Sequence, residues 1–335
     1  MRAWMLHEPG VMESSPLVLE EVSEPEPGRG EIRLQVQCCG LCRTDLHIAE
    51  GELVAGGYPV IPGHQIVGIV DAVGPDVDED LVGTRRGGYW LHHACGQCTW
   101  CDQNLENLCE ESVFTGLDAP GGFAEKVIVN VDYSVPIPGG LESFAAAPLL
   151  CAGIIGYRSL RLSDLGQGER LALFGFGASA HIVIQVAQFW GCEVVVYTRS
   201  PDHQQMAQDM GAIWVGEAGK ESGPPCDRAI TFAPVGNIAI EALRAVRPGG
   251  TVALNAVTMS DIPSFPYDLI YGERTLRSVA NVTRQDAEAF MKLAGEIPVR
   301  TSVQPFAFSR LNEALLALKN SEIDGAAVLD MGDFQ

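Results

Sequence analysis

Four cysteines stand close together in the pattern Cys95-x2-Cys98-x2-Cys101-x7-Cys109. Four thiols at this spacing are typical of a closed tetrahedral zinc site, which holds a loop in place and leaves no open position for a substrate. We expect no export signal at the start of the sequence, and in a reducing compartment clustered thiols bind metal more often than they form disulfides. The pattern therefore predicts a structural zinc site.

Three further potential ligands, Cys42, His64 and Cys151, are dispersed along the first half of the chain. Two thiols and an imidazole make a three-ligand zinc site whose fourth position is open to water or an alcohol, as catalytic zinc requires. An isolated cysteine or histidine is more often an ordinary core residue, and Cys38 and Cys39 illustrate that alternative. The catalytic zinc site is therefore a hypothesis that depends on the fold.

The pattern of apolar residues changes near residue 151. Before it, short β-branched runs such as 31–36 and 66–74 are separated by Gly and Pro, which indicates a small irregular β domain. From about 153 to 282, strand, glycine turn and helix repeat, which predicts a parallel sheet. We expect strands at 170–174, 192–197, 228–232 and 251–254. Nearer the C-terminus we expect helices at 285–294 and 311–319 and a last strand at 325–329.

A glycine turn follows the first of those strands directly and precedes a helical segment at 182–188. Its residues fit G-x-G-x-x-A and are Gly175, Phe176, Gly177, Ala178, Ser179 and Ala180. Between a strand and a helix, the glycine backbone and the helix N-terminus can hold a pyrophosphate. The turn predicts a dinucleotide site, with a tight structural turn that binds nothing as the alternative.

The residues after the next strand distinguish the two nicotinamide cofactors. An acidic residue there binds the ribose 2′-hydroxyl of NAD, whereas the 2′-phosphate of NADP requires cations and hydroxyls. The segment has no carboxylate and offers Thr198, Arg199 and Ser200. It favours NADP(H) over NAD(H); a solvated Arg199 without a ligand is the alternative.

The charge of the chain excludes one class of partner. The 335 residues include 43 acidic and 22 basic side chains, a formal net charge of −21, which repels a nucleic-acid backbone. The longest apolar stretch, near residues 145–155, contains Pro148 and is shorter than the roughly 18–20 residues that cross a bilayer. We therefore expect a cytoplasmic protein that acts on a small molecule, with neither nucleic acid nor membrane as a partner.

Together these motifs resemble those of the zinc-dependent medium-chain alcohol dehydrogenases, a family of the medium-chain dehydrogenase/reductase superfamily, over nearly the whole chain. Residues 39–47 resemble the first ligand motif of the family and residues 63–68 the second, while the four-cysteine loop and the glycine turn follow in the order of the family. The resemblance implies an α/β fold with a GroES-like β domain over 1–152, completed by 283–335. A doubly wound Rossmann domain is expected over 153–282.

The resemblance also implies roles for individual residues. Cys42, His64 and Cys151 match the catalytic zinc ligands, and the four clustered cysteines match the structural ones, which gives two zinc ions per chain. Thr44 and His47 match a proton relay that runs from the alcohol through the cofactor ribose to solvent. Asp45 matches the carboxylate that orients the ligand histidine. Arg43 and Arg284 match positions that can contact the cofactor pyrophosphate, with a solvated or salt-bridged arginine as the alternative for Arg284.

Three other positions bear on substrate and rate. Trp90 and Leu53 match the substrate pocket, which implies an apolar slot for an alkyl or aryl primary alcohol, although both also suit an ordinary core. Gln65 stands where the family usually has a glutamate beside the ligand histidine. Because a neutral amide does not lower the charge felt at the metal, we expect slower zinc exchange and turnover. His181 has no role that the sequence reveals.

The resulting hypothesis is an oxidoreductase that transfers a hydride between a primary alcohol or aldehyde and a nicotinamide cofactor, with NADP(H) favoured. Two rival hypotheses stand beside it. One is a zinc-free quinone or enone reductase of the same superfamily, which the complete set of zinc ligands argues against. The other is a non-catalytic redox sensor that binds zinc and a dinucleotide, which Gln65 favours. The resemblance further implies a homodimer or homotetramer.

Overall fold

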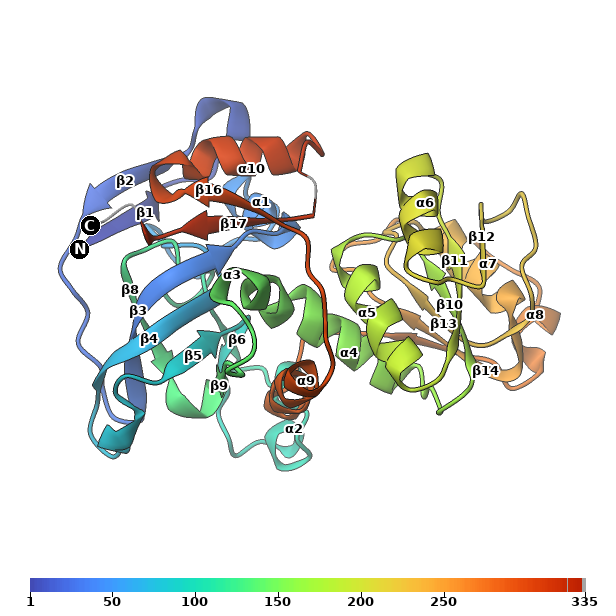
Figure 1. Cartoon of the computed structure of the whole chain (residues 1–335), viewed down its shortest axis with the longest axis horizontal. Helices are drawn as coiled ribbons and strands as arrows, with labels where there is room; N and C mark the ends of the chain where they lie inside the picture. The colour runs from blue at the N-terminus through green and yellow to red at the C-terminus, as the bar shows by residue number, and fades with distance from the viewer. Residues whose placement is uncertain (324, 333–335) are drawn as a thin grey trace. The chain divides into compact units, whose positions relative to one another are not determined.

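The chain forms two compact units (Figure 1). The computed structural model describes residues 1–323 and 325–332. One unit comprises Met1–Cys151 together with the chain from Asn281 onward, and the other comprises Ala152–Ala280. The first is therefore built from both ends of the sequence, and the second from a single continuous segment.

The first unit is organised around two long antiparallel strands, β3 (Glu31–Gly40) and β4 (Gln65–Val73). In β3 the side chains of Ile32, Leu34 and Val36 are buried while the residues between them are more exposed, as the two-residue period of a strand requires. The strand order of this sheet is β16 (Val303–Ala307), β17 (Ala326–Asp330), β3, β4, β5 (Arg85–Gly88) and β9 (Ser134–Pro136), with β8 (Lys126–Asn130) paired to β3. The C-terminal strands β16 and β17 thus extend the N-terminal sheet.

Shorter elements surround this sheet. The hairpin β1 (Arg2–Leu6) and β2 (Leu17–Glu21) is antiparallel, and a second small pair, β6 (Leu91–His93) and β7 (Val113–Phe114), encloses the four-cysteine loop. Helix α10 (Leu311–Lys319) packs on β16 and β17 (Figure 1). The remaining helices of the unit are α1 (Arg43–Ala49), α2 (Thr99–Asp102), α3 (Ser143–Ala146) and α9 (Arg284–Glu296).

The second unit is a parallel sheet in the order β12 (Trp214–Gly216), β11 (Glu193–Tyr197), β10 (Arg170–Phe174), β13 (Cys226–Thr231), β14 (Val246–Leu254) and β15 (Thr275–Ser278). Numbered from β10, this is the strand order of a doubly wound dinucleotide-binding sheet. The order reverses between β10 and β13, and ligands of such sheets bind beyond the carboxyl ends of the strands at that reversal. The glycine turn predicted from the sequence follows β10 at this point.

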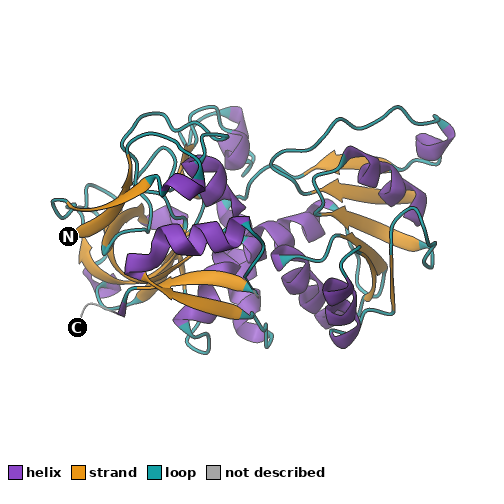
Figure 2. Cartoon of the chain, turned by 90° about the horizontal axis from the view of Figure 1, so that it is seen from above, coloured by secondary structure: helices purple, strands orange, loops and turns teal. Residues whose placement is uncertain are grey.

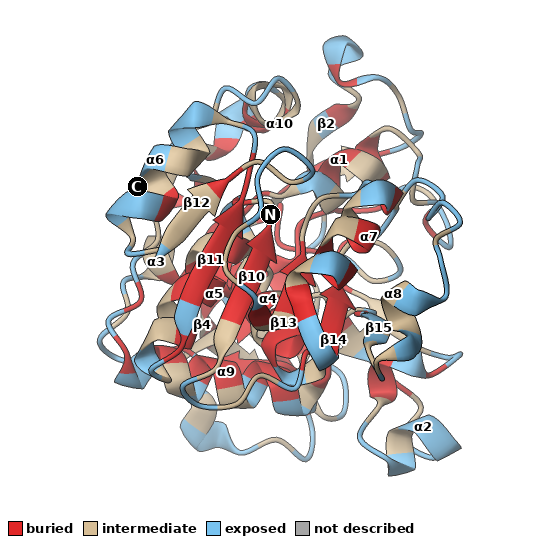
Figure 3. Ribbon diagram, turned by 90° about the vertical axis from the view of Figure 1, so that its right-hand side faces the viewer, coloured by how far each residue is buried: buried red, intermediate tan, exposed pale blue. Residues whose placement is uncertain are grey.

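The central strands of the second unit are mostly apolar in their carboxyl halves and carry charged residues at their amino ends. Figure 3 shows β10, β11, β13 and β14 largely buried, as is typical of parallel sheets. Helix α5 (Ala178–Phe189) packs on β11, and α7 (Gly236–Ala245) packs on β13 and β14. Figure 2 shows helices lying against the strands of this unit. The other helices of the unit are α4 (Ala152–Leu162), α6 (Pro201–Asp209) and α8 (Asp268–Tyr271).

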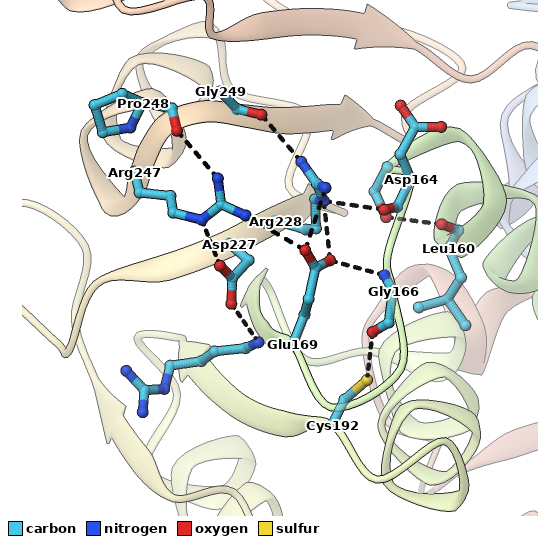
Figure 4. A network of polar contacts seen from close by, with 12 residues as sticks. Leu160, Asp164, Gly166, Glu169, Cys192, Asp227, Arg228, Arg247, Pro248 and Gly249 are labelled. Carbon is cyan, nitrogen blue, oxygen red and sulfur yellow. Dashed lines mark hydrogen bonds and ion pairs between the residues drawn. The ribbon is translucent and has the colours of Figure 1, made fainter.

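An ion-pair network joins the amino ends of three of these strands (Figure 4). The Glu169 carboxylate accepts hydrogen bonds from the backbone N–H of Gly166 at 2.7 Å and from the Arg228 guanidinium at 3.1 and 3.2 Å. Asp227 accepts from the Arg170 backbone at 2.8 Å and from Arg247 Nε at 2.5 Å. The negative charges of the acids and the positive charges of the arginines thus balance at the amino end of the sheet, opposite the glycine turn.

The α/β class with a GroES-like and a Rossmann-type part, predicted from the sequence, is confirmed. The strand at 170–174 and the helix at 311–319 have their expected bounds, whereas β13 and β14 begin earlier, at Cys226 and Val246. Helix α5 begins at Ala178 and so includes the last three residues of the glycine turn. Within the described residues no single helix is long and apolar enough to cross a membrane. The bent pair of helical segments Ser143–Leu150 and Ala152–Leu162 reaches that length and apolar composition only when its two parts are taken together.

Candidate active site and metal centres

The fold brings Cys42, His64 and Cys151 together in the first unit. In the register of β3 and β4, Gly40 pairs with Gln65, so Cys42 and His64 lie just beyond the paired ends of two neighbouring strands. Cys151 follows the short 3-10 helix at Ala147–Leu150, which contacts both strands. The potential ligand atoms of the three residues all lie within 4.8 Å of one another.

The spacing of these atoms fits a tetrahedral zinc ion. Zinc–sulfur bonds of about 2.3 Å and zinc–nitrogen bonds of about 2.0–2.1 Å place two sulfurs about 3.8 Å apart and a sulfur and a nitrogen about 3.6 Å apart. The Sγ atoms of Cys42 and Cys151 are 4.0 Å apart, and Cys42 Sγ is 3.4 Å from His64 Nε2. A disulfide would need about 2.05 Å between the sulfurs. The three ligands leave one position of the tetrahedron open.

Asp45 faces the other side of the histidine ring. Its Oδ1 lies 3.3 Å from His64 Nδ1, and its Oδ2 accepts a hydrogen bond from the Cys42 backbone N–H at 2.8 Å. Both side chains are almost fully buried. The carboxylate therefore holds the imidazole with Nε2 toward the two sulfurs, which is the arrangement of a carboxylate–histidine–metal triad.

The electrostatics of this group also favour a cation. Burial by itself lowers the pKa of His64, but the neighbouring Cys42 sulfur and the Asp45 carboxylate outweigh burial and raise that pKa to about 10. The hydrogen bond to Cys151, together with burial, raises the pKa of the Cys42 thiol well above its ordinary value. A divalent ion bound among these atoms would supply the positive charge that allows the Cys42 thiol to lose its proton.

The four clustered cysteines form a second group with zinc-like spacing. Sulfur–sulfur distances are 3.6 Å for Cys98–Cys101, 3.6 Å for Cys95–Cys109 and 3.9 Å for Cys95–Cys101, close to the roughly 3.8 Å of a tetrahedral thiolate site. The sulfur atoms of all four residues lie within 4.8 Å of one another. With four sulfur ligands this site is closed, so it suits a structural ion.

Gln65 is buried beside the three-ligand site. A Cβ on Gly40 would lie 2.9 Å from its Oε1, so the glycine makes room for the amide. Among the described residues its Nε2 has no hydrogen-bond partner. A neutral amide therefore occupies the place at which the resemblance to the family leads us to expect a carboxylate.

Helix α1 carries the expected relay residues. Thr44 and His47 are three positions apart and therefore share one face of the helix. Nδ1 of His47 contacts the carboxylate of Glu52, and the backbone carbonyl of His47 accepts from Leu53 N–H at 3.0 Å. Arg43 is the first residue of the helix and is exposed.

Trp90 packs directly against the ligand histidine. Its ring meets the His64 ring edge to face at 5.1 Å and stacks on Phe114 at 5.2 Å with an interplanar angle of 16°. Phe114, at the end of β7, did not follow from the sequence; its only signal there was its position shortly after the four-cysteine loop. Leu53 packs against the hydrophobic core of the first unit. The site therefore has an aromatic wall next to a metal ligand.

The second unit holds the predicted dinucleotide residues. Gly175 has φ +92°, a left-handed conformation that favours glycine, and its N–H donates to Tyr197 O at 2.8 Å. Gly177 precedes α5, and Ala178, Ser179 and Ala180 form the first turn of that helix. The segment from Thr198 to Ser200 links β11 to α6: Ser200 Oγ accepts from His203 N–H, Thr198 is buried and Arg199 is exposed.

Arg284 lies beside the four-cysteine loop. Its Nε and its backbone N–H both donate to Glu106 Oε1, at 3.0 and 3.2 Å, and its guanidinium lies 5.2 Å from the centre of the Tyr133 ring. Arg284 therefore forms the salt bridge named as the alternative, and its contact with the pyrophosphate stays a prediction. Sequence reasoning missed Glu106, a buried acid between the third and fourth cysteines.

Two family models match the chain. One is described as the alcohol dehydrogenase GroES-like domain and matches residues 28–139; the other is described as zinc-binding dehydrogenase and matches residues 180–296. Among individual proteins, the chain is 42% identical over 335 residues to the probable alcohol dehydrogenase AdhA of Mycobacterium tuberculosis, covering 98% of this chain and 97% of that one. An alcohol dehydrogenase of Geobacillus stearothermophilus is 32% identical over 329 residues, covering 94% and 96%.

A solved structure of another protein has the same fold. The cinnamyl alcohol dehydrogenase SbCAD4 of Sorghum bicolor superimposes with a TM-score of 0.88 at 25% identity, covering 98% of this chain and 97% of that chain. The fold and the matching family models are those of a medium-chain dehydrogenase/reductase. The chain belongs to the zinc-type alcohol dehydrogenases of that family, and its relatives support an alcohol dehydrogenase activity on small alcohols or aldehydes.

Proposed function

We propose that the protein is a zinc-dependent alcohol dehydrogenase and aldehyde reductase that uses NADP(H) in preference to NAD(H). The observation that carries this proposal is the set Cys42, His64 and Cys151, whose sulfur and nitrogen atoms have tetrahedral spacing with one position open. The same observation argues against the zinc-free reductase alternative, which has no use for such a set.

In this proposal, residues of the first unit bind the metal, orient its histidine ligand and transfer the alcohol proton. When bound, zinc polarises the substrate oxygen and lowers the pKa of an alcohol, while the nicotinamide exchanges a hydride with the carbinol carbon. Cys42, Cys151 and His64 would hold the metal, and Asp45 would keep the imidazole in its ligating orientation. The Thr44 hydroxyl would take the alcohol proton, and His47 on the same helix face would pass that proton to solvent.

The cofactor proposal rests on the second unit. The first-turn N–H groups of α5, in Ala178, Ser179 and Ala180, would receive the pyrophosphate, because they have no partner within the helix. After β11, no carboxylate stands between Tyr197 and Ser200, and the exposed Arg199 is the residue suited to a 2′-phosphate.

The aromatic wall supports a planar substrate. Because Trp90 touches both the ligand histidine and Phe114, an aryl or conjugated primary alcohol bound at the open metal position would lie against a flat surface. The solved cinnamyl alcohol dehydrogenase, which has the same fold, supports this substrate class.

We also propose that the protein is a homo-oligomer. Strand β15 is the last strand of its sheet and its residues are mostly exposed. Tyr267, directly before helix α8, and Tyr271, at the end of that helix, are each 70% exposed. An open strand edge with exposed aromatic residues suits pairing with a second copy. Light scattering after size exclusion tests this, and a monomer at micromolar concentration would contradict it.

The decisive experiment combines metal content with turnover. The wild-type protein, purified without chelator, should contain two zinc ions per chain by plasma mass spectrometry and should reduce aryl aldehydes. Cys42→Ser should contain one zinc and lose turnover, because a hydroxyl is a poor zinc ligand. Cys192→Ser is the matched control, since Cys192 lies in the second unit and belongs to neither cluster. Full activity of Cys42→Ser would refute the zinc mechanism.

Cofactor preference is tested separately by kcat/KM with NADPH and with NADH. A tenfold NADH preference, about 1.4 kcal/mol, would contradict the assignment of Thr198, Arg199 and Ser200. Arg199→Ala should lower kcat/KM for NADPH but leave that for NADH nearly unchanged, because only the former cofactor presents a phosphate to the guanidinium.

A further inference from the structure

His181 follows the glycine turn directly and has no part in the proposed function so far. It lies in the first half of α5, and its backbone N–H donates to the carbonyl of Gly177 at 3.1 Å. Its side chain reaches the same oxygen, with Nδ1 2.9 Å away. The Gly177 carbonyl therefore receives both the first hydrogen bond of the helix and a second one from the imidazole.

The geometry fixes the direction of that second bond. A carbonyl oxygen can only accept, so Nδ1 must carry the proton and donate it. Gly177 is the residue that precedes the helix, with φ −99° and ψ −162°, and it has no side chain to restrict its backbone. The imidazole thus restrains a glycine whose conformation sets the direction of the backbone N–H groups of Ala178 and Ser179.

The ring of His181 is held from two sides. It packs on the buried Phe176, with ring centres 4.8 Å apart, and its Nε2 contacts Sδ of Met206 on α6. Helix α6 is also tied to the segment after β11, because Gln204 Nε2 donates to Thr198 O at 2.8 Å. The histidine therefore lies between the glycine turn and the helix that follows the predicted 2′-phosphate segment.

We propose that His181 is a positioning residue for the dinucleotide: its Nδ1–H fixes Gly177 so that the first turn of α5 presents its N–H groups to the pyrophosphate. This rests on the proposed use of a nicotinamide cofactor. Pre-organisation of this kind improves affinity because the free protein has already lost the conformational freedom that binding would otherwise remove. Since NADH and NADPH share the pyrophosphate, the effect is the same for both.

Two substitutions of His181 distinguish the effect of the Nδ1–H hydrogen bond from the effect of ring packing. In His181→Asn, Nδ2 stands near the position of Nδ1 and keeps the donor but removes the ring. In His181→Phe, the ring remains and the donor is lost. His7→Phe is the matched control, because His7 is an exposed histidine in the other unit that pairs with Glu20. The readout is the Kd of NADPH and of NADH by fluorescence titration, beside the melting temperature of each variant.

We expect His181→Phe to weaken both cofactors by a similar factor, about three- to tenfold, as the loss of one hydrogen bond gives. His181→Asn should retain most of the wild-type affinity, and His7→Phe all of it. Unchanged binding in His181→Phe, equal loss in the Asn and Phe variants, or a loss confined to NADPH would overturn the inference. A wild-type protein that binds neither dinucleotide would overturn the proposed function itself.

Discussion

Glu106 and Arg284, which are 178 positions apart in the sequence, form an ion pair that ties the four-cysteine loop to the first turn of α9. Glu106 is only 3% exposed, and one of its oxygens accepts both hydrogen bonds from Arg284. The pair joins a segment close to the N-terminal sheet with the point at which the chain returns to the first unit. The ion pair thus links the four-cysteine loop to the segment that begins the C-terminal part of the first unit.

Removing this charge should destabilise the first unit. Glu106→Gln leaves Arg284 without its anion, and we expect the free energy of unfolding to fall by about 1–3 kcal/mol. Arg284→Gln should cost a similar amount. Denaturant unfolding of both single variants and the double variant measures the coupling between them, and additive losses would show that the pair makes no joint contribution.

The same variants decide what Arg284 does. If the ion pair is its whole role, Glu106→Gln and Arg284→Gln change the cofactor Kd to the same small extent. A Kd that rises with Arg284→Gln alone would restore the pyrophosphate contact that the sequence comparison suggested.

The two groups of potential metal ligands differ in how far the sequence alone could predict them. For Cys95, Cys98, Cys101 and Cys109 the local spacing suffices, whereas Cys42, His64 and Cys151 needed the resemblance to be chosen from among other cysteines. Their meeting depends on the register of β3 with β4, a long-range pairing that no local pattern encodes.

What the sequence could not show were contacts between side chains from distant segments. The partner of Arg284 is a buried acid in a loop, and Phe114 is recognisable only once β7 lies beside Trp90. His181 is a similar case, because its acceptor is a backbone carbonyl and its other neighbour is on the next helix. Composition and periodicity carry no information on such pairs.

The network in Figure 4 predicts a pH dependence of stability. Burial raises the pKa of Asp227, but hydrogen bonds from the Arg170 backbone and Arg247 outweigh burial, so its pKa in the folded state is below the ordinary value. A lowered pKa means that the carboxylate stabilises the fold above the ordinary pKa, near 3.8, and that this stabilisation is lost as the pH falls.

Asp227→Asn should therefore be less stable than the wild type at pH 7, and the difference should narrow as the pH falls below about 4. Denaturant unfolding at pH 7, 5 and 3.5 follows the difference. A gap that stays constant over this range would mean that the charge of Asp227 does not contribute.

The cysteines outside both clusters should be chemically inert in the native protein. Burial raises the pKa of the Cys38 and Cys226 thiols to about 12 in each case, and both residues are at most 1% exposed. At pH 8 only about one in ten thousand of such thiols is ionised, and the thiolate is the reactive form. Iodoacetamide followed by peptide mass spectrometry should leave both unmodified until denaturant is added. Rapid labelling of either in the native state would contradict the packing around it.

The aromatic wall predicts a change of substrate selectivity. Phe114→Ala removes the ring stacked on Trp90 without touching a metal ligand, and a lost aromatic pair costs about 0.5–1.5 kcal/mol beyond its buried area. We expect kcat/KM for a cinnamyl-type aldehyde to fall by about tenfold, and that for a two- or three-carbon aldehyde to change much less. Parallel steady-state kinetics test this, and an equal loss for both substrates would show that the wall has a purely structural role.

Gln65 predicts a slow exchange of the catalytic zinc. Its amide is buried beside Gly40, has no partner for Nε2 among the residues that the structure describes, and brings no charge to the site. In Gln65→Glu, a carboxylate of nearly the same shape would lower the net positive charge at the metal and compete with a bound ligand, so zinc transfer to a chromophoric chelator should accelerate by about tenfold. Gln35→Glu is the control, because Gln35 is exposed on the neighbouring strand. Equal transfer rates in the wild type and Gln65→Glu would mean that the amide does not govern exchange, and the slow turnover expected from it would then have no basis.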